Sequence, residues 1–364
     1  MKASAAFLTL AVALSCTSAF AGWTVSYLHP TGFDWSWGYG VSGAQQVGWA
    51  TTGVYKDYEH AALWNGTAAS FVDLSPAGYG ESLATSTSAG QQTGYAFLAG
   101  SSSQAHAGVW RGTSASWVDI NPAGCSSSYA WGVSSGQQVG YSKGLATGNH
   151  NHASLWGGSA ASWMDLNPAG YNSSHAMAVS NGEQVGYVSP SGNDHACLWN
   201  GTAASWVNLH PTSSTYSRAF AVSDGWQGGL ARINNYSHAA LWKGTAGSFT
   251  DLNPVGCSSS VIRAMSGGRQ VGAASSKACI WAGTIGSWED LHLLLGPDCW
   301  SSCAYGVEVQ DSDVWVVGEA YYGTTGQYEA ILWHNVIPEP SSLLALGAGL
   351  LGLVGVFRRS VRPV

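Results

Sequence analysis

Histidine and aspartate side chains recur at regular intervals along this 364-residue chain. The histidines begin segments that resemble His-Ala-x-Leu-Trp: His60, His106, His152, His195 and His238. The aspartates recur likewise, with Asn208 replacing one of them: Asp73, Asp119, Asp165, Asp251 and Asp290. Imidazoles can bind metal ions, and paired carboxylates can hydrolyse glycosidic bonds. Equivalent residues of a repeat lie far apart, however. We therefore expect each histidine to hydrogen-bond backbone or the aspartate of its own unit, and we predict no metal and no cofactor.

A catalytic site is expected among residues that interrupt the repeat. Asp34, Asp224 and Asp298 are such residues. Carboxylates of this kind could serve an enzyme that acts on extracellular polysaccharide, which is the alternative function. The sequence has no phosphate-binding loop, nucleophile elbow or zinc-ligand spacing. We therefore assign no catalytic residue.

Several of the 19 tryptophans fall outside the repeated tryptophan positions. Four of them lie next to the interruptions named above: Trp35, Trp37, Trp226 and Trp300. Trp49 and Trp131 also fall outside these positions. An exposed indole face can stack on a sugar ring while its polar edge stays hydrated. We predict Trp35, Trp37, Trp226 and Trp300 as glycan-binding residues.

The elements that would hold these residues follow a sevenfold repeat. Its anchors are seven tryptophans with a mean spacing of about 45 residues: Trp64, Trp110, Trp156, Trp199, Trp242, Trp281 and Trp333. Each period contains four short segments with the alternation of β-strands, and Asn-Gly pairs such as Asn65-Gly66 mark hairpin turns. This period is typical of a four-stranded propeller blade.

The two ends of the repeat do not match. No fourth strand follows Trp333, whereas an additional strand-like segment, Thr24 to Pro30, precedes the first unit. An N-terminal strand that completes the last blade would remove the free sheet edges. We predict an all-β fold over residues 22–335, a β-propeller of seven four-stranded blades closed by the N-terminal strand. Six or eight blades, or another closed β-array, are the alternatives.

The units resemble the HAF family of extracellular repeats. The matching segments are Gln138-Val139-Gly140-Tyr141 and His152-Ala153-Ser154-Leu155-Trp156, although the family's Phe is Ala, Gly, Ser or Cys here. This resemblance implies an exported repeat protein and brings no known catalytic residue with it.

Residues 1–21 have the features of a secretory signal peptide. Lys2 is followed by an apolar run, and Ala19-Phe20-Ala21 forms a cleavage site, so the mature chain should begin at Gly22. Cys16 leaves lipoprotein attachment as an alternative.

Residues 336–364 combine a short motif, an apolar segment and a basic cluster. The motif is Pro338-Glu339-Pro340, the apolar segment spans 343–357, and Arg358 and Arg359 follow. We predict a single, marginally long transmembrane helix with its arginines in the cytoplasm.

This tail resembles the PEP-CTERM sorting signal of Gram-negative bacteria. The resemblance implies processing by an exosortase-type protease, transient anchoring in the inner membrane, and delivery to the cell surface or the exopolysaccharide matrix. A permanent anchor is the alternative.

Composition limits the remaining functions. A net charge of −7 without a basic stripe disfavours nucleic acid as a partner. Six cysteines remain after signal cleavage, and a local disulfide between Cys299 and Cys303 is expected. We predict a non-catalytic surface or matrix protein that binds polysaccharide or an envelope partner. A purely mechanical matrix component is a further alternative.

Overall fold

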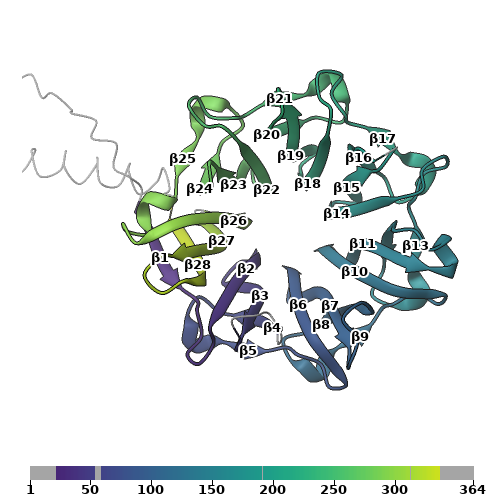
Figure 1. Ribbon diagram of the computed structural model, residues 1–364, viewed down its shortest axis with the longest axis horizontal. Coiled ribbons are helices and arrows are strands. Elements are labelled where there is room, and N and C mark those ends of the chain that lie inside the picture. Colours follow the sequence, from purple (N-terminus) through teal and green to yellow (C-terminus); the bar gives the residue numbers. More distant parts are fainter. Residues whose placement is uncertain (1–21, 54–58, 191, 312, 337–364) are drawn as a thin grey trace, which may run out of the picture.

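The computed structural model describes residues 22–53, 59–190, 192–311 and 313–336. These residues form seven antiparallel four-stranded sheets arranged as blades around one axis (Figure 1). The all-β propeller and its seven blades are therefore confirmed. The predicted signal peptide and the C-terminal helix lie outside the described residues. Within those residues, no helix is both long and apolar enough to cross a membrane.

Each blade runs outward from an innermost first strand. Blades 1 to 3 comprise β2 (Trp35–Ser42), β3 (Gln45–Thr51), β4 (Glu59–Trp64) and β5 (Val72–Asp73); β6 (Tyr79–Ser88), β7 (Gln91–Leu98), β8 (Ala105–Trp110) and β9 (Val118–Asp119); and β10 (Cys125–Ser134), β11 (Gln137–Gly144), β12 (His152–Trp156) and β13 (Met164–Asp165).

The remaining blades repeat this pattern, with longer strands in the last. Blades 4 to 7 comprise β14 (Ser174–Ser180), β15 (Glu183–Val188), β16 (His195–Trp199) and β17 (Val207–Asn208); β18 (Ser217–Ser223), β19 (Trp226–Ile233), β20 (Tyr236–Trp242) and β21 (Thr250–Asp251); β22 (Ser260–Ser266), β23 (Arg269–Ala274), β24 (Lys277–Trp281) and β25 (Glu289–Asp290); and β26 (Cys299–Gln310), β27 (Asp313–Tyr322), β28 (Gln327–Val336) and β1 (Trp23–Tyr27).

Short 3-10 helices join the third and fourth strands of blades 1 to 6. They are η1 (Ala68–Ser70), η2 (Ser114–Ser116), η4 (Ala160–Ser162), η5 (Ala203–Ser205), η6 (Ala246–Ser248) and η7 (Ile285–Ser287). Two more, η3 (Leu145–Thr147) and η8 (His292–Leu294), lie after β11 and β25.

The N-terminal strand closes the ring. β1 pairs antiparallel with β28, with Trp23 opposite Asn335 and Tyr27 opposite Ile331. This pairing confirms the predicted closure. It supplies the fourth strand that the C-terminal part of the sequence lacks, and so covers a sheet edge that would otherwise be exposed.

The core lies between blades and is built around the repeated tryptophans. All seven anchor tryptophans at the ends of the third strands are at most 1% exposed, and they are among the largest fully buried side chains: Trp64, Trp110, Trp156, Trp199, Trp242, Trp281 and Trp333. Each packs into an apolar cluster, as Trp199 does with residues from β11 to β16. Because burying a large side chain stabilises by several kcal/mol, this position fixes the period.

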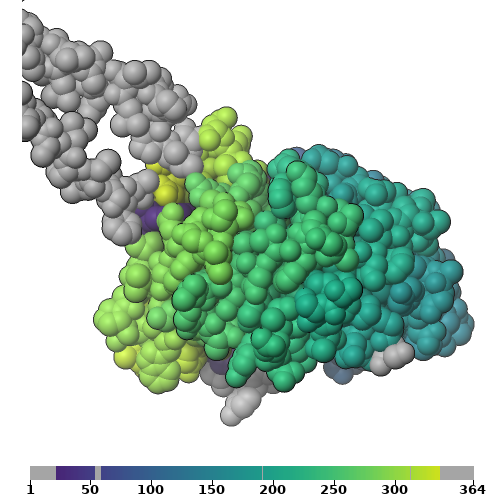
Figure 2. Space-filling view, turned by 90° about the horizontal axis from the view of Figure 1, so that it is seen from above, coloured from purple at the N-terminus to yellow at the C-terminus, as the bar shows by residue number. Residues whose placement is uncertain are grey.

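The propeller has two different faces, which Figure 2 shows edge-on as the top and bottom of a thick disc. The "hairpin face" carries the turns between first and second strands and between third and fourth strands. The "loop face" carries the connections between second and third strands and between blades. Val336 lies opposite Asp313, next to the β26–β27 turn, and Trp23 lies opposite Asn335. Both described ends of the chain therefore lie at the hairpin face of blade 7.

Candidate functional site

Four of the five recurrent histidines bond the aspartate of their own blade, as expected. The Nδ1–Oδ2 distances are 2.7 Å for His60–Asp73, 2.6 Å for His106–Asp119, and 2.7 Å for both His152–Asp165 and His238–Asp251. His195, whose blade has Asn208, instead stacks on His210 with 3.7 Å between ring centroids. Among the described residues, no three His, Cys, Asp or Glu side chains are grouped so that they could hold a metal ion.

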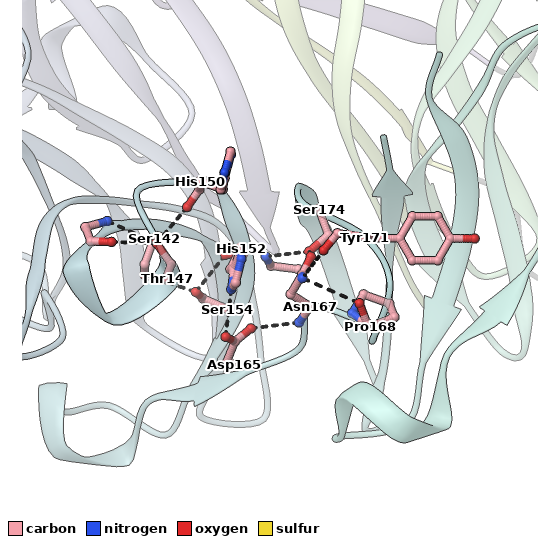
Figure 3. Close-up of polar contacts among 12 residues, drawn as sticks. Ser142, Thr147, His150, His152, Ser154, Asp165, Asn167, Pro168, Tyr171 and Ser174 are labelled. Carbon is pink, nitrogen blue, oxygen red and sulfur yellow. Dashed lines mark hydrogen bonds and ion pairs between the residues drawn. The ribbon is translucent and has the colours of Figure 1, made fainter. Parts of the chain in front are cut away.

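The aspartate of each pair also fixes the backbone that follows it. Asp165 Oδ1 accepts a hydrogen bond of 2.7 Å from the backbone N–H of Asn167, so both carboxylate oxygens have partners (Figure 3). The same contact recurs at Asp73, Asp119 and Asp251. These carboxylates organise the turn into the next blade, which is a structural role.

A buried serine that was not predicted from the sequence joins each pair of adjacent blades. Ser174 Oγ accepts a 2.9 Å hydrogen bond from the backbone N–H of Ala153 and donates a 2.7 Å bond to Asn167 Oδ1 (Figure 3). Equivalent N–H to Oγ bonds occur at all seven junctions, through Ser36, Ser82, Ser128, Ser174, Ser217, Ser260 and Ser302. The sequence feature that could have predicted this contact is a serine at the same position near the start of the first strand of every blade.

The three carboxylates that interrupt the repeat do not gather into one site. Asp34 and Asp298 precede the innermost strands β2 and β26 at the loop face. Asp224 lies in the β18–β19 turn at the hairpin face. A joint catalytic role for all three is therefore not supported by their positions.

The predicted disulfide between Cys299 and Cys303 is wrong for this structure. Both thiols are free, as are the other four described cysteines. The two residues lie on one strand, and four residues of extended chain span about 13 Å, far beyond the Cα separation of about 7 Å that a disulfide can bridge. The Cys299 thiol instead contacts Ser301 O at 3.2 Å.

Three of the four predicted tryptophans come together at the loop face. Trp300 contacts Tyr321 (6.0 Å between centroids), and Tyr321 contacts Tyr328 (4.8 Å). Tyr328 stacks on Trp37 (4.3 Å), and Trp35 lies edge-on to both at 6.0 and 6.2 Å. Trp300 is 69% exposed. Its indole lies over Gly323, where a Cβ would come within 1.9 Å of the ring, so a larger residue there would displace the indole.

Ring contacts continue around the loop face into blades 1 to 5. Trp37 stacks on Trp49, which shares a cluster with Tyr95 of blade 2. From Tyr95 the series passes to Tyr129, Tyr141, His175, Tyr187 and Arg218, with ring centroids 4.5 to 4.8 Å apart and the guanidinium 4.2 Å from the last ring. We call these residues the aromatic belt: Trp300, Tyr321, Tyr328, Trp35, Trp37, Trp49, Tyr95, Tyr129, Tyr141, His175, Tyr187 and Arg218.

Much of the belt comes from one position of the repeat. The residue after the glycine of the second strand is Trp49, Tyr95, Tyr141 and Tyr187 in blades 1 to 4. The equivalent residue of blade 7 is Glu319, which pairs with Cys303 across the sheet. Glu319 is 7% exposed, its Oε2 has no hydrogen-bond partner, and burial raises its pKa to about 8. Neither the belt position nor this carboxyl was predicted from the sequence.

Each innermost strand also has a β-bulge. In strands such as β2, the bulge residue lies two positions after a belt residue, here Trp37. The additional residues are Tyr39, Thr85, Trp131, Met177, Phe220, Arg263 and Tyr305. Several contact each other across blade boundaries: Tyr39 and Tyr305 have ring centroids 5.2 Å apart, and Arg263 lies over Phe220 and Tyr305. The bulges therefore place large side chains around the axis, next to the belt.

The fourth predicted tryptophan, Trp226, lies apart from the belt. It lines a pocket of about 300 Å³ at the hairpin face, with Asp224, Met265 and Gln270. The Lys243 ammonium lies 4.7 Å from the Trp226 ring. Trp226 is thus on the face where the two described ends of the chain lie.

Comparisons with known proteins identify the tail and the fold. Residues 336–359 match the PEP-CTERM protein-sorting motif, which confirms that prediction and implies export, exosortase processing and sorting to the cell surface. A comparison with curated protein sequences gave no match. The HAF resemblance stays a prediction.

Solved structures with the same architecture are distant in sequence. Puromycin hydrolase aligns with a TM-score of 0.52 at 11% identity, covering 86% of this chain and 55% of its own. The acylaminoacyl peptidase of Pyrococcus horikoshii gives 0.52 at 10% identity, covering 86% and 54%. This chain thus spans about half the length of both. The β-propeller domain of the Trilobed protease from Pyrococcus furiosus, which has an open velcro topology, gives 0.53 at 12% identity, covering 84% and 98%.

At these identities the likeness shows the fold alone. The present chain closes its ring by the β1–β28 pairing. It is a seven-bladed β-propeller followed by a PEP-CTERM sorting motif.

Proposed function

We propose that this protein is a non-catalytic, polysaccharide-binding propeller displayed at the cell surface or in the exopolysaccharide matrix. The aromatic belt is the observation that carries this proposal. Its ring contacts run from Trp300 in blade 7 to Arg218 in blade 5. Trp300 is exposed, and Trp35, Tyr321 and Tyr328 are partly exposed, so these rings offer contacts to a sugar chain, whereas Trp49, Tyr95 and Tyr187 of the belt are buried.

The chemistry of the belt suits a weak, repeated interaction. Each aromatic contact contributes about 0.5–1.5 kcal/mol beyond area burial. Three such contacts sum to about 1.5–4.5 kcal/mol, which corresponds to dissociation constants in the millimolar range or weaker. A polymer that presents many equivalent units would be retained through multivalency.

The placement of the two faces supports display. The sorting motif begins at Val336, which lies at the hairpin face. The belt lies at the loop face. While the tail is in a membrane, the belt therefore points away from that attachment and toward the surrounding polysaccharide.

Binding of the producer's purified exopolysaccharide to the mature chain tests the proposal. Trp300→Ala removes an exposed side chain, so the fold should persist while affinity falls about threefold to tenfold, in line with one stacking contact. Trp226→Ala, on the opposite face, is the matched control and should leave affinity unchanged. Loss of binding in Trp226→Ala alone, or no binding by the unchanged protein, would contradict the proposal.

A further inference from the structure

Glu319 is a buried acid inside the aromatic surroundings of blades 7 and 1, where, in addition to burial, Glu59 raises the pKa of Tyr39 and Glu329 raises the pKa of Cys299. Glu319 lies on β27 between Cys303 of β26 and Ala330 of β28. The ion pairs formed among the described residues do not include it. With 7% exposure and Oε2 unbonded, this carboxyl is desolvated without compensation.

The groups around Glu319 are mainly phenols and indoles. Burial raises the pKa of Tyr39, Tyr305 and Tyr328, and the neighbouring Glu319 carboxyl raises each of them further. Trp37 stacks on Tyr328, and β2 approaches β27 so closely that a Cβ on Gly38 would lie 2.3 Å from Val317 Cγ2. Tyr39, Tyr305, Tyr328 and Trp37 are partly exposed, so these walls can be reached from solvent. We call Glu319 with these four residues the Glu319 cluster.

Arg263 is a permanent cation in this region that forms no ion pair with Glu319, and its Nε is buried without a hydrogen-bond partner. Arg263 lies over the rings of Phe220 and Tyr305, and its positive charge acts on Tyr39 and on the Cys303 thiol, whose pKa burial raises. Burial alone raises the pKa of Glu319.

An organic cation is the ligand that this combination favours. A carboxylate supplies the opposite charge, and aromatic faces attract ammonium groups through their quadrupoles. An anion would be repelled, and the described residues offer no group of three metal ligands here. The net charge of −7 also favours encounter with a positively charged polymer.

We infer that the Glu319 cluster is a subsite for an amino sugar whose nitrogen carries a free ammonium group. This inference rests on the proposed polysaccharide binding at the belt and specifies one unit of the ligand. The ammonium would pair with Glu319, while the sugar ring lies against the partly exposed rings of Trp37 and Tyr328, whose facing surfaces are already stacked on each other. An N-acetylated sugar has no charge there and would leave the carboxyl unpaired.

Calorimetric titration of the mature protein with two matched probes tests this inference: a glucosamine tetramer and its fully N-acetylated counterpart. The glucosamine tetramer should bind at least tenfold more tightly. Glu319→Gln should remove this preference. Glu308→Gln is the control, because Glu308 is a partly buried carboxyl at the other end of β26. Titrations of the glucosamine tetramer at pH 6, in two buffers of different ionisation enthalpy, should show that binding releases about one proton from the protein. The Glu319→Gln variant should release no such proton.

The outcomes separate the two proposals. Equal binding of both tetramers, or an unchanged preference in Glu319→Gln, would overturn the amino-sugar subsite while polysaccharide binding at the belt stands. The same holds if the producer's polysaccharide binds and neither tetramer does. If neither the polysaccharide nor either tetramer binds, the proposed function itself fails.

Discussion

Glu319 places a buried carboxyl group at a repeat position where four other blades have an aromatic ring. Blades 1 to 4 have Trp49, Tyr95, Tyr141 and Tyr187 at the equivalent position. Burial of those aromatic side chains stabilises the folded state. A carboxyl group in the same place loses its hydration, and burial raises its pKa to about 8. Such a cost is commonly maintained where the group has a task in binding or catalysis.

The Glu319 carboxyl should make stability fall as pH rises. The unfolded chain loses this proton near the ordinary pKa of about 4.5, whereas the folded chain keeps it to about 8. Between these values the folded state binds more protons, so the free energy of unfolding decreases with pH. Glu319→Gln should remove this decrease and raise stability at pH 8 by a few kcal/mol at most. Urea unfolding of the unchanged protein and of Glu319→Gln at pH 5 and pH 8 measures the effect. An equal change in the free energy of unfolding of the two proteins between these pH values would refute it.

At the scale of the blade, local signals account for what the sequence could predict. The tryptophan spacing, the Asn-Gly turns and the unmatched strand Thr24–Pro30 are each local, and they led to the correct blade number and closure. The belt is different, because its contacts join residues such as Trp37 and Tyr328 that are far apart in sequence. The disulfide failed because sequence proximity does not bring two residues of one strand together.

The serine junction is the element-scale feature with the clearest energetic consequence. Ser174 is fully buried and bonds both Ala153 N–H and Asn167 Oδ1. Ser174→Ala leaves a buried N–H without an acceptor and should lower the free energy of unfolding by about 1–3 kcal/mol. The exposed Ser102→Ala serves as the control, since surface changes usually stay within about 0.5 kcal/mol. Equal urea midpoints for the two variants would contradict the assigned role.

At the scale of the whole molecule, closure depends on a short N-terminal segment. β1 contributes five paired residues to blade 7, and Leu28 just after it is fully buried. A mature chain that lacks residues 22–30 exposes the β28 edge and an apolar surface. We expect its free energy of unfolding to fall by several kcal/mol.

Thermal unfolding of the shortened chain tests this expectation. A synthetic peptide of residues 22–30, added in excess, should restore part of the lost stability because it can pair with β28. An unchanged melting temperature would mean that the β1–β28 pairing contributes little to holding the ring together.

The whole molecule also separates attachment from recognition. Both described ends of the propeller lie at the hairpin face, and the exposed Trp300 of the belt lies at the loop face. A protein carried by its tail can therefore present one face to a polymer while the other faces its attachment point. The Trp226 pocket is on the hairpin face, so Trp226 serves as a control for binding at the loop face.

Oxidative footprinting of tryptophans, with and without the producer's exopolysaccharide, tests polysaccharide binding at the belt most directly. The account predicts that the polysaccharide protects Trp300 of the belt and leaves the oxidation of Trp226 unchanged. Protection of Trp226 alone, or equal oxidation of Trp300 in both samples, would contradict it.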